Sequence, residues 1–163
     1  MLSVLVAARR WGSGMQHSLI ALLIFLGSLG AAQAQTVAEV ASKWGLLGTW
    51  QIDCRAPVSR SNGAITYLVT GGKLQMQRDF GGDKNAGNDT NTIVAAARKP
   101  DGTLEYTTVF PSLGQTRQQT DTKGSDGRRR ALSNRNVDTN EYTIKDGKLV
   151  SNGTDSLWQT RCR

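Results

Sequence analysis

The chain carries the pentapeptide WQIDC at residues 50–54 and a close copy of it, WQTRC, at residues 158–162. Each copy begins with a tryptophan and ends with one of the two cysteines of the chain. Residues four apart lie on the same face of a β-strand, so we expect each tryptophan on the same side as its cysteine. A disulfide between Cys54 and Cys162 would then join the first and last strands of a sheet beside two large aromatic anchors.

The first 34 residues have the pattern of a cleaved signal peptide. Arg9 and Arg10 precede an apolar run at residues 19–29, and Ala-Gln-Ala at 32–34 forms a small-x-small cleavage site. The apolar run is shorter than the about 20 residues that a membrane-spanning helix needs. We therefore predict an exported protein, periplasmic or secreted, with no integral membrane segment after cleavage.

Export makes a disulfide the expected state of the two cysteines, because oxidising compartments allow such bonds to persist. The chain has one histidine, His17, which leaves with the predicted signal peptide. The remaining chain therefore cannot form a Ser-His-Asp or Cys-His site and lacks the imidazole ligands usual for zinc. These features favour a protein that is not an enzyme, and they indicate no catalytic residue, metal site or cofactor.

Residues 35–163 are long enough for one domain with one core. Within the leader, residues 35–45, Thr36 and Glu39 resemble a capping box and predict a short helix. From residue 46 onward the pattern is one of short strands separated by turns, such as Gly71-Gly72 and Asp146-Gly147.

Closely spaced hairpins with no crossover helix predict an all-β, up-and-down antiparallel barrel of about eight strands. This β-barrel domain would occupy residues 46–163. An open sandwich of two sheets is the alternative architecture.

The sequence Gly48-Thr49-Trp50, which follows the predicted helix and opens the first strand, resembles the Gly-x-Trp signature of the lipocalin and avidin group of barrels. In that group the tryptophan closes one end of the barrel and a basic residue of the last strand packs over it. The resemblance implies these roles for Trp50 and for Arg161 or Arg163. The chain also looks like uncharacterised small exported bacterial proteins of this kind.

A second resemblance is to exported inhibitors of bacterial metalloproteases, which are small barrels with one disulfide and a similar beginning. These inhibitors insert an extended N-terminal segment into the protease cleft. The resemblance implies that role for residues 35–43, and it implies a protein partner.

Four side chains are candidates for binding a ligand inside the barrel: Arg78, Tyr106, Arg117 and Tyr67. Arg78 falls on the otherwise apolar face of residues 73–80, where it could bind an anion or extend its head from the barrel mouth into water. Residues 115–122 are polar on both faces, which predicts either convergent polar groups around a ligand or an edge strand wet on both sides.

The net charge of +7 does not by itself indicate binding to nucleic acid. The densest basic cluster, residues 128–130 with Arg135, lacks interleaved aromatic residues and is interpreted as a solvated face. Trp50 and Trp158 are interpreted as core plugs, and Trp44 as a staple between the helix and the barrel end. The sequence thus favours an exported barrel that binds a small anionic or amphipathic ligand in its lumen, with the inhibitor-like module as the alternative.

Overall fold

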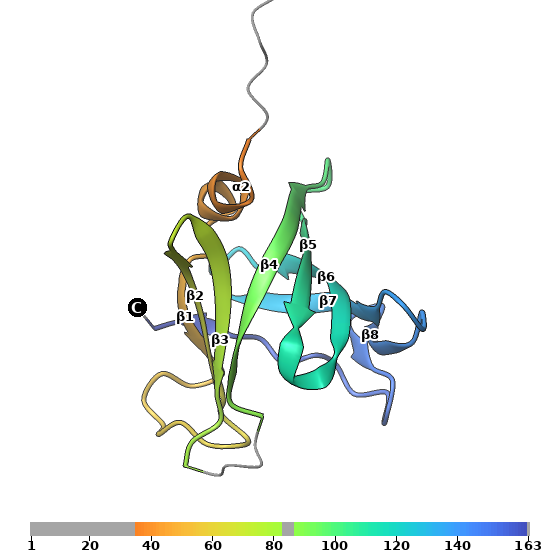
Figure 1. The fold of residues 1–163 in the computed structure, drawn as a ribbon. Coiled ribbons are helices and arrows are strands. Elements are labelled where there is room, and N and C mark those ends of the chain that lie inside the picture. Colours follow the sequence, from red (N-terminus) through yellow and green to blue (C-terminus); the bar gives the residue numbers. More distant parts are fainter. Residues whose placement is uncertain (1–34, 83–86, 163) are drawn as a thin grey trace, which may run out of the picture. The chain divides into compact units, whose positions relative to one another are not determined.

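One antiparallel sheet makes up most of the structure, a computed structural model that describes residues 35–82 and 87–162 (Figure 1). The chain divides after Ala34, and the sheet belongs to the unit that begins at Gln35. The predicted signal peptide lies outside the described residues.

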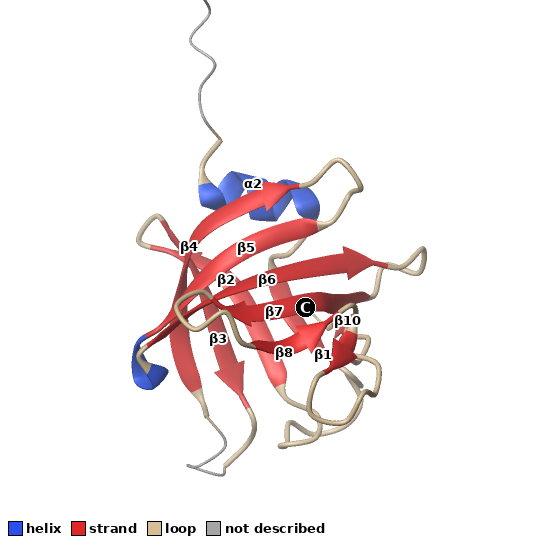
Figure 2. Ribbon diagram, turned by 90° about the vertical axis from the view of Figure 1, so that its right-hand side faces the viewer, coloured by secondary structure: helices blue, strands red, loops and turns tan. Residues whose placement is uncertain are grey.

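The sheet contains ten strands in the order β10-β1-β2-β3-β4-β5-β6-β7-β8-β9, all joined by antiparallel pairing. Helix α2 packs against β4 and β3, at one end of the sheet (Figure 2). The bounds of these elements are α2 Val37–Trp44, β1 Gly48–Gln51, β2 Ala64–Thr70, β3 Lys73–Asp79, β4 Asp89–Arg98, β5 Leu104–Phe110, β6 Gln115–Lys123, β7 Arg129–Asn136, β8 Tyr142–Lys145, β9 Lys148–Leu149 and β10 Thr160–Arg161, with a 3-10 turn at Pro111–Leu113.

The predicted all-β meander is confirmed, but the sheet is a ten-stranded half-barrel where the sequence predicted a closed barrel of about eight strands. Strands β9 and β10, at the two edges of the sheet, are two residues long each and do not pair with each other. A single bridge between Arg129 and Gln159 links β7 to the segment before β10. Its two backbone hydrogen bonds measure 3.0 and 2.7 Å.

The hairpin β2–β3 illustrates how the local sequence sets the fold. Gly71 and Gly72 both have positive φ, 57° and 74°, which a two-residue turn of this hand requires. On β5 the burial alternates strictly, with Leu104, Tyr106, Thr108 and Phe110 buried. Strand periodicity therefore determines which face of β5 points into the half-barrel.

Helix α2 closes one end of the apolar core. Thr36 and Glu39 form the predicted capping box, and Gly45 ends the helix with φ 81°. The indole of Trp44 donates a hydrogen bond of 2.8 Å to the Gly102 carbonyl, and Lys123 donates to the carbonyl of Trp44. Trp44 thus joins the helix to the sheet as predicted, and the extended leader that the inhibitor hypothesis needs is replaced by a docked helix.

Cys54 and Cys162 form the predicted disulfide, with their Cα atoms 5.5 Å apart. The expectation that each cysteine shares a face with its tryptophan is wrong for Cys54. Strand β1 ends at Gln51, and Cys54 lies in the turn that follows, so strand alternation does not extend to it. The two cysteines line a groove with Thr49 and Gln51, whose side chains alternate with Trp50 and so face the other side.

Replacing both cysteines by serine should lower the free energy of unfolding by about 2–5 kcal/mol, because the bond closes a loop of 108 residues. Urea unfolding of the oxidised protein and of the C54S/C162S variant, followed by tryptophan fluorescence, measures the difference. The reduced wild-type protein serves as the control and should match the variant. Equal midpoints for the oxidised protein and the variant would contradict the expectation.

Candidate functional site

The concave face of the half-barrel holds a cavity of about 310 Å³. Its walls combine two classes of side chain. The apolar ones are Ile52, Ile65, Met76, Phe80, Phe110, Ala131, Ile144, Leu149 and Leu157, and the polar ones are Tyr67, Arg78, Gln119, Asp121, Arg129, Asn134, Ser156 and Gln159.

An ion pair between Arg129 of β7 and Asp121 of β6 forms the floor of this cavity. Arg129 Nη1 lies 2.5 Å from Asp121 Oδ2. Only 2% of the surface of Arg129 and none of that of Asp121 is exposed. Two neighbouring strands thus bring opposite charges together inside the protein, where either charge alone would strongly destabilise the fold.

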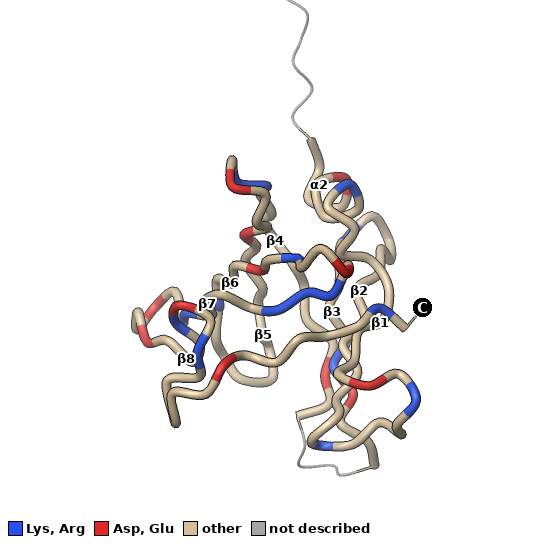
Figure 3. Tube along the Cα trace, turned by 180° about the vertical axis from the view of Figure 1, so that it is seen from behind, with Lys and Arg blue, Asp and Glu red and all other residues tan. Residues whose placement is uncertain are grey.

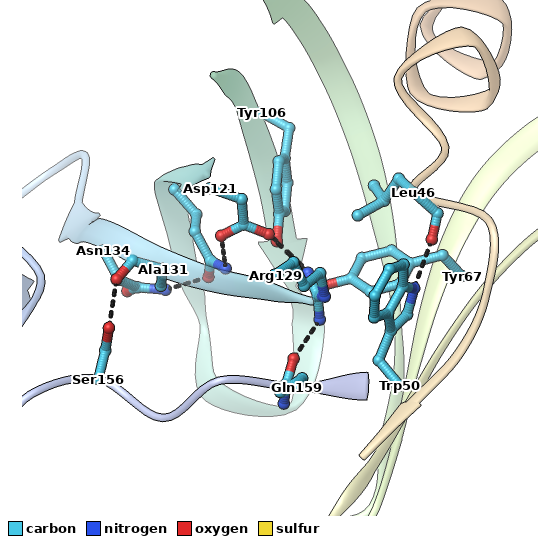
Figure 4. Close-up of polar contacts among 11 residues, drawn as sticks. Leu46, Trp50, Tyr67, Tyr106, Asp121, Arg129, Ala131, Asn134, Ser156 and Gln159 are labelled. Atoms are coloured by element: carbon cyan, nitrogen blue, oxygen red, sulfur yellow. Dashed lines mark hydrogen bonds and ion pairs between the residues drawn. The ribbon is translucent and has the colours of Figure 1, made fainter. Parts of the chain in front are cut away.

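Uncharged groups from β2, β5, β6 and the C-terminal segment complete the contacts of this pair (Figure 4). Arg129 also donates to the Tyr67 hydroxyl at 3.0 Å and to Gln159 Oε1 at 2.6 Å. Asp121 accepts from the Tyr106 hydroxyl at 3.2 Å and from Gln119 Nε2 at 2.7 Å. The network therefore connects β2, β5, β6, β7 and the C-terminal segment.

The guanidinium of Arg129 also lies over two aromatic rings, 5.1 Å from the centre of Trp50 and 4.7 Å from that of Tyr67. Trp50 is buried, as the resemblance implied, and its indole donates to the Leu46 carbonyl. The cation over it comes from β7 and not from the last strand. Arg161 pairs with Trp50 through the backbone and is itself exposed, and Arg163 lies outside the described residues.

Burial changes the proton affinities of the groups at the floor. Desolvation raises the pKa of Asp121, although Arg129, Gln119 and Tyr106 act in the opposite direction. Desolvation disfavours the charged form of Arg129, but the facing oxygens of Tyr67, Asp121 and Tyr106 more than offset it, so its pKa is raised. Burial also raises the pKa of both tyrosines, which therefore stay neutral at neutral pH.

One donor of the floor has no hydrogen-bond partner among the described residues. It is Nε of Arg129, whose side chain is almost fully buried and lines the cavity. Leaving a buried donor unpaired costs free energy.

A second ion pair lies on the wall of the cavity. Arg78 of β3 donates to Asp89 of β4 through Nε at 2.7 Å and Nη2 at 2.5 Å, and it lies 4.9 Å from the centre of the Phe110 ring. Asp89 also accepts from Asn91 and Ser112. Burial works against the charged form of Asp89, but these donors outweigh it and lower its pKa.

The structure brings some of the predicted ligand residues together and leaves one apart. Tyr67 and Arg78 line the cavity. Tyr106 lies behind the floor, with its hydroxyl 2.9 Å from that of Tyr67. Arg117 is not part of the cavity lining, and it donates to neutral oxygens of Asn134, Gln115 and Thr143.

The interpretation of the basic cluster at residues 128–130 as a solvated face holds only in part. The consecutive arginines appear as a blue stretch at the start of β7 in Figure 3. Arg128 and Arg130 contact the ring of Trp158, at 5.6 and 5.0 Å, while Arg129 between them is buried. Trp158 is only partly buried, in contact with these two arginines, and it is not among the buried core residues.

The Arg129–Asp121 pair was not predicted from the sequence as a site. A signal was present, because strand alternation places Arg129 opposite its two neighbours and puts Arg117, Gln119 and Asp121 on one face of β6. The pairing itself depends on a register shift between Thr120 and Asp121, which the sequence does not reveal.

Comparison of the chain with known protein families, with characterised proteins and with solved structures finds no significant match. The resemblance to the lipocalin and avidin group therefore remains a prediction from a short motif. In the described ranges, 35–82 and 87–162, no helix is long and apolar enough to span a membrane. The same residues contain no group of three or more acidic, cysteine or histidine side chains placed to hold a metal ion.

Replacing Asp121 by asparagine should lower the free energy of unfolding by about 3–5 kcal/mol, because it leaves the charge of Arg129 buried without its counterion. The double variant D121N/R129M should lose less than D121N alone. Urea unfolding of the two single variants and the double variant gives the coupling energy.

The matched control is Asp155→Asn, which removes an acid from the exposed pair with Lys148. That change should cost at most about 1 kcal/mol. A D121N variant as stable as D155N would show that the buried pair does not behave as described.

Asp89 should make stability sensitive to acid. Its pKa in the folded protein is lowered, so its contribution is present above the pKa of the unfolded chain and is lost as the pH falls through the folded value. Between about pH 5 and about pH 2, wild type should therefore lose more stability than D89N. Unfolding curves at a series of pH values test this, and parallel losses in the two proteins would contradict it.

Proposed function

We propose that this protein binds a small amphipathic molecule in the cavity of the half-barrel. The observation that carries the proposal is the division of the cavity into apolar walls and a polar floor. Small-molecule sites are typically concave and mostly apolar, with a few fixed polar groups and volumes of about 300–1000 Å³. The cavity of this protein has that composition, and its volume of about 310 Å³ lies at the small end of the range.

The mouth of the cavity supports an apolar body for the ligand. Ile52 and Leu157 line it, yet they are 37% and 61% exposed. Large apolar side chains at the rim of a cavity leave surface that a ligand can cover. A molecule that entered head first would place its apolar part between these residues and the Ile65, Met76 and Phe110 side chains.

The floor supports a defined position for the polar head. Arg129 is held by hydrogen bonds to Asp121, Tyr67 and Gln159. A side chain with so many fixed contacts is already oriented before a ligand arrives, which reduces the entropy cost of binding. Binding of this kind agrees with the prediction of an exported ligand-binding barrel, and it uses Tyr67 and Arg78 of the four residues predicted from sequence.

Filling the cavity should abolish binding. Ala131 lines it, so Ala131→Phe would occupy the space of the ligand. Ala97→Phe makes the same change at an exposed position of β4 and is the matched control. We expect octanol to bind wild type and A97F equally and to bind A131F at least about tenfold more weakly, measured by displacement of an uncharged fluorescent naphthylamine. Equal binding to A131F and A97F would refute the proposed site.

A further inference from the structure

The charges that face the cavity cancel one another. Its lining contains three charged side chains, Arg78, Asp121 and Arg129. Asp121 contacts Arg129 at 2.5 Å, and Arg78 contacts a fourth charged group, Asp89, at 2.5 Å. Each arginine of the cavity thus already has a carboxylate as its partner.

This charge balance determines whether the floor of the cavity can bind an anionic ligand. The attraction of a ligand carboxylate to Arg129 would be offset by repulsion from Asp121, which lies against the same guanidinium. The cost of removing the ligand carboxylate from water would then have no compensation. An uncharged oxygen loses much less hydration on entering the same place.

The hydrogen bonds of the floor leave no position that requires a charged ligand. Arg129 Nε is a buried donor without a partner in the described part of the chain. Both oxygens of Asp121 already accept hydrogen bonds, Oδ1 from Gln119 and Oδ2 from Arg129 and Tyr106. The unpaired donor has almost no accessible surface, so a hydroxyl or carbonyl oxygen would reach it only after a small shift of the floor side chains. The exclusion of anions therefore depends on the pairing of Arg129 with Asp121.

We infer that the cavity selects uncharged amphipathic molecules, such as alcohols, esters or amides, over the corresponding carboxylates, and that Asp121 is the residue that excludes the anions. This inference rests on the proposed function and deepens it. It also separates the two ligand classes that the sequence left open, the anionic and the amphipathic.

Arg117 is the inward-facing cation that could act against this selection. It lies on the same face of β6 as Asp121, and among the described ion pairs it has no carboxylate partner. Its guanidinium is nevertheless occupied by the oxygens of Asn134, Gln115 and Thr143, and it lies outside the cavity lining. An anion held by Arg117 would be a different site with a different dependence on mutation.

The test compares ligands of equal chain length on the unmodified protein at neutral pH, where the acid is ionised. Octanol, methyl octanoate and octanoate each compete with the uncharged naphthylamine probe. We expect octanol and methyl octanoate to bind at least about tenfold more tightly than octanoate. Tighter binding of octanoate would overturn the inference and leave the proposed function standing, whereas failure of all ligands and of the probe would overturn both.

Two variants then assign the selection to a residue. Asp121→Asn should shift the ratio of affinities by about tenfold toward octanoate, because it leaves the charge of Arg129 free to attract an anion. Asp138→Asn makes the same change at an exposed turn residue and should not alter the ratio.

Arg117→Gln should also leave the ratio unchanged. A ratio that responds to R117Q and not to D121N would overturn the role of Asp121. The comparison on the unmodified protein does not depend on whether D121N folds.

Discussion

The contact between Arg129 and Asp121 is the interaction around which the concave face is arranged. It joins β6 and β7 directly, and through Tyr67 and Gln159 it extends to β2 and to the C-terminal segment. A buried ion pair is weak evidence for stability, because removing two charges from water cancels much of their attraction. Its effect here is positional, since the guanidinium can satisfy all these partners only when four separate segments are in register.

This network lies where the apolar core meets the cavity, because Tyr67 belongs to both. The core also includes the buried residues Trp44, Leu46 and Leu104. The cavity shares Met76 and Phe110 with this core, and its apolar lining reaches the surface at Ile52 and Leu157. The guanidinium of Arg129 lies over the rings of Trp50 and Tyr67, so one cation contacts both the packed core and the cavity lining.

The C-terminal segment is held at the concave face by contacts of three kinds. The disulfide ties its end to the turn after β1, the Arg129–Gln159 bridge ties it to β7, and two residue pairs join β10 to β1. Because Ser156, Leu157 and Gln159 of this segment line the cavity, the same contacts shape the ligand site. A half-barrel with such short final strands would otherwise leave this side of the cavity without a wall.

The parts of the fold that follow from local patterns were predictable from the sequence. The turn at Gly71-Gly72, the alternation of Leu104 and Tyr106, and the capping box at Thr36 depend on residues that are neighbours in the chain. For the polar strand β6 the sequence left two environments open, a lumen with convergent polar groups and an edge wet on both sides, because polar side chains can be satisfied either by water or by one another. In the structure Gln119 donates to Asp121 and accepts from Asn134, so these polar side chains face inward and satisfy one another.

By itself, the sequence determined an antiparallel meander, the pairing of its two cysteines and the anchoring of a short helix by Trp44. These features depend on residue periodicity, turn chemistry and the number of cysteines, all of which can be read directly from the sequence. Only the tertiary structure decided that the sheet is a half-barrel and that Trp158 lies near the surface. It also decided that Arg129, unlike its neighbours in the basic cluster, is buried and forms an ion pair with Asp121. Those outcomes depend on register shifts and on the balance between desolvation and contact, which arise only when distant strands lie side by side.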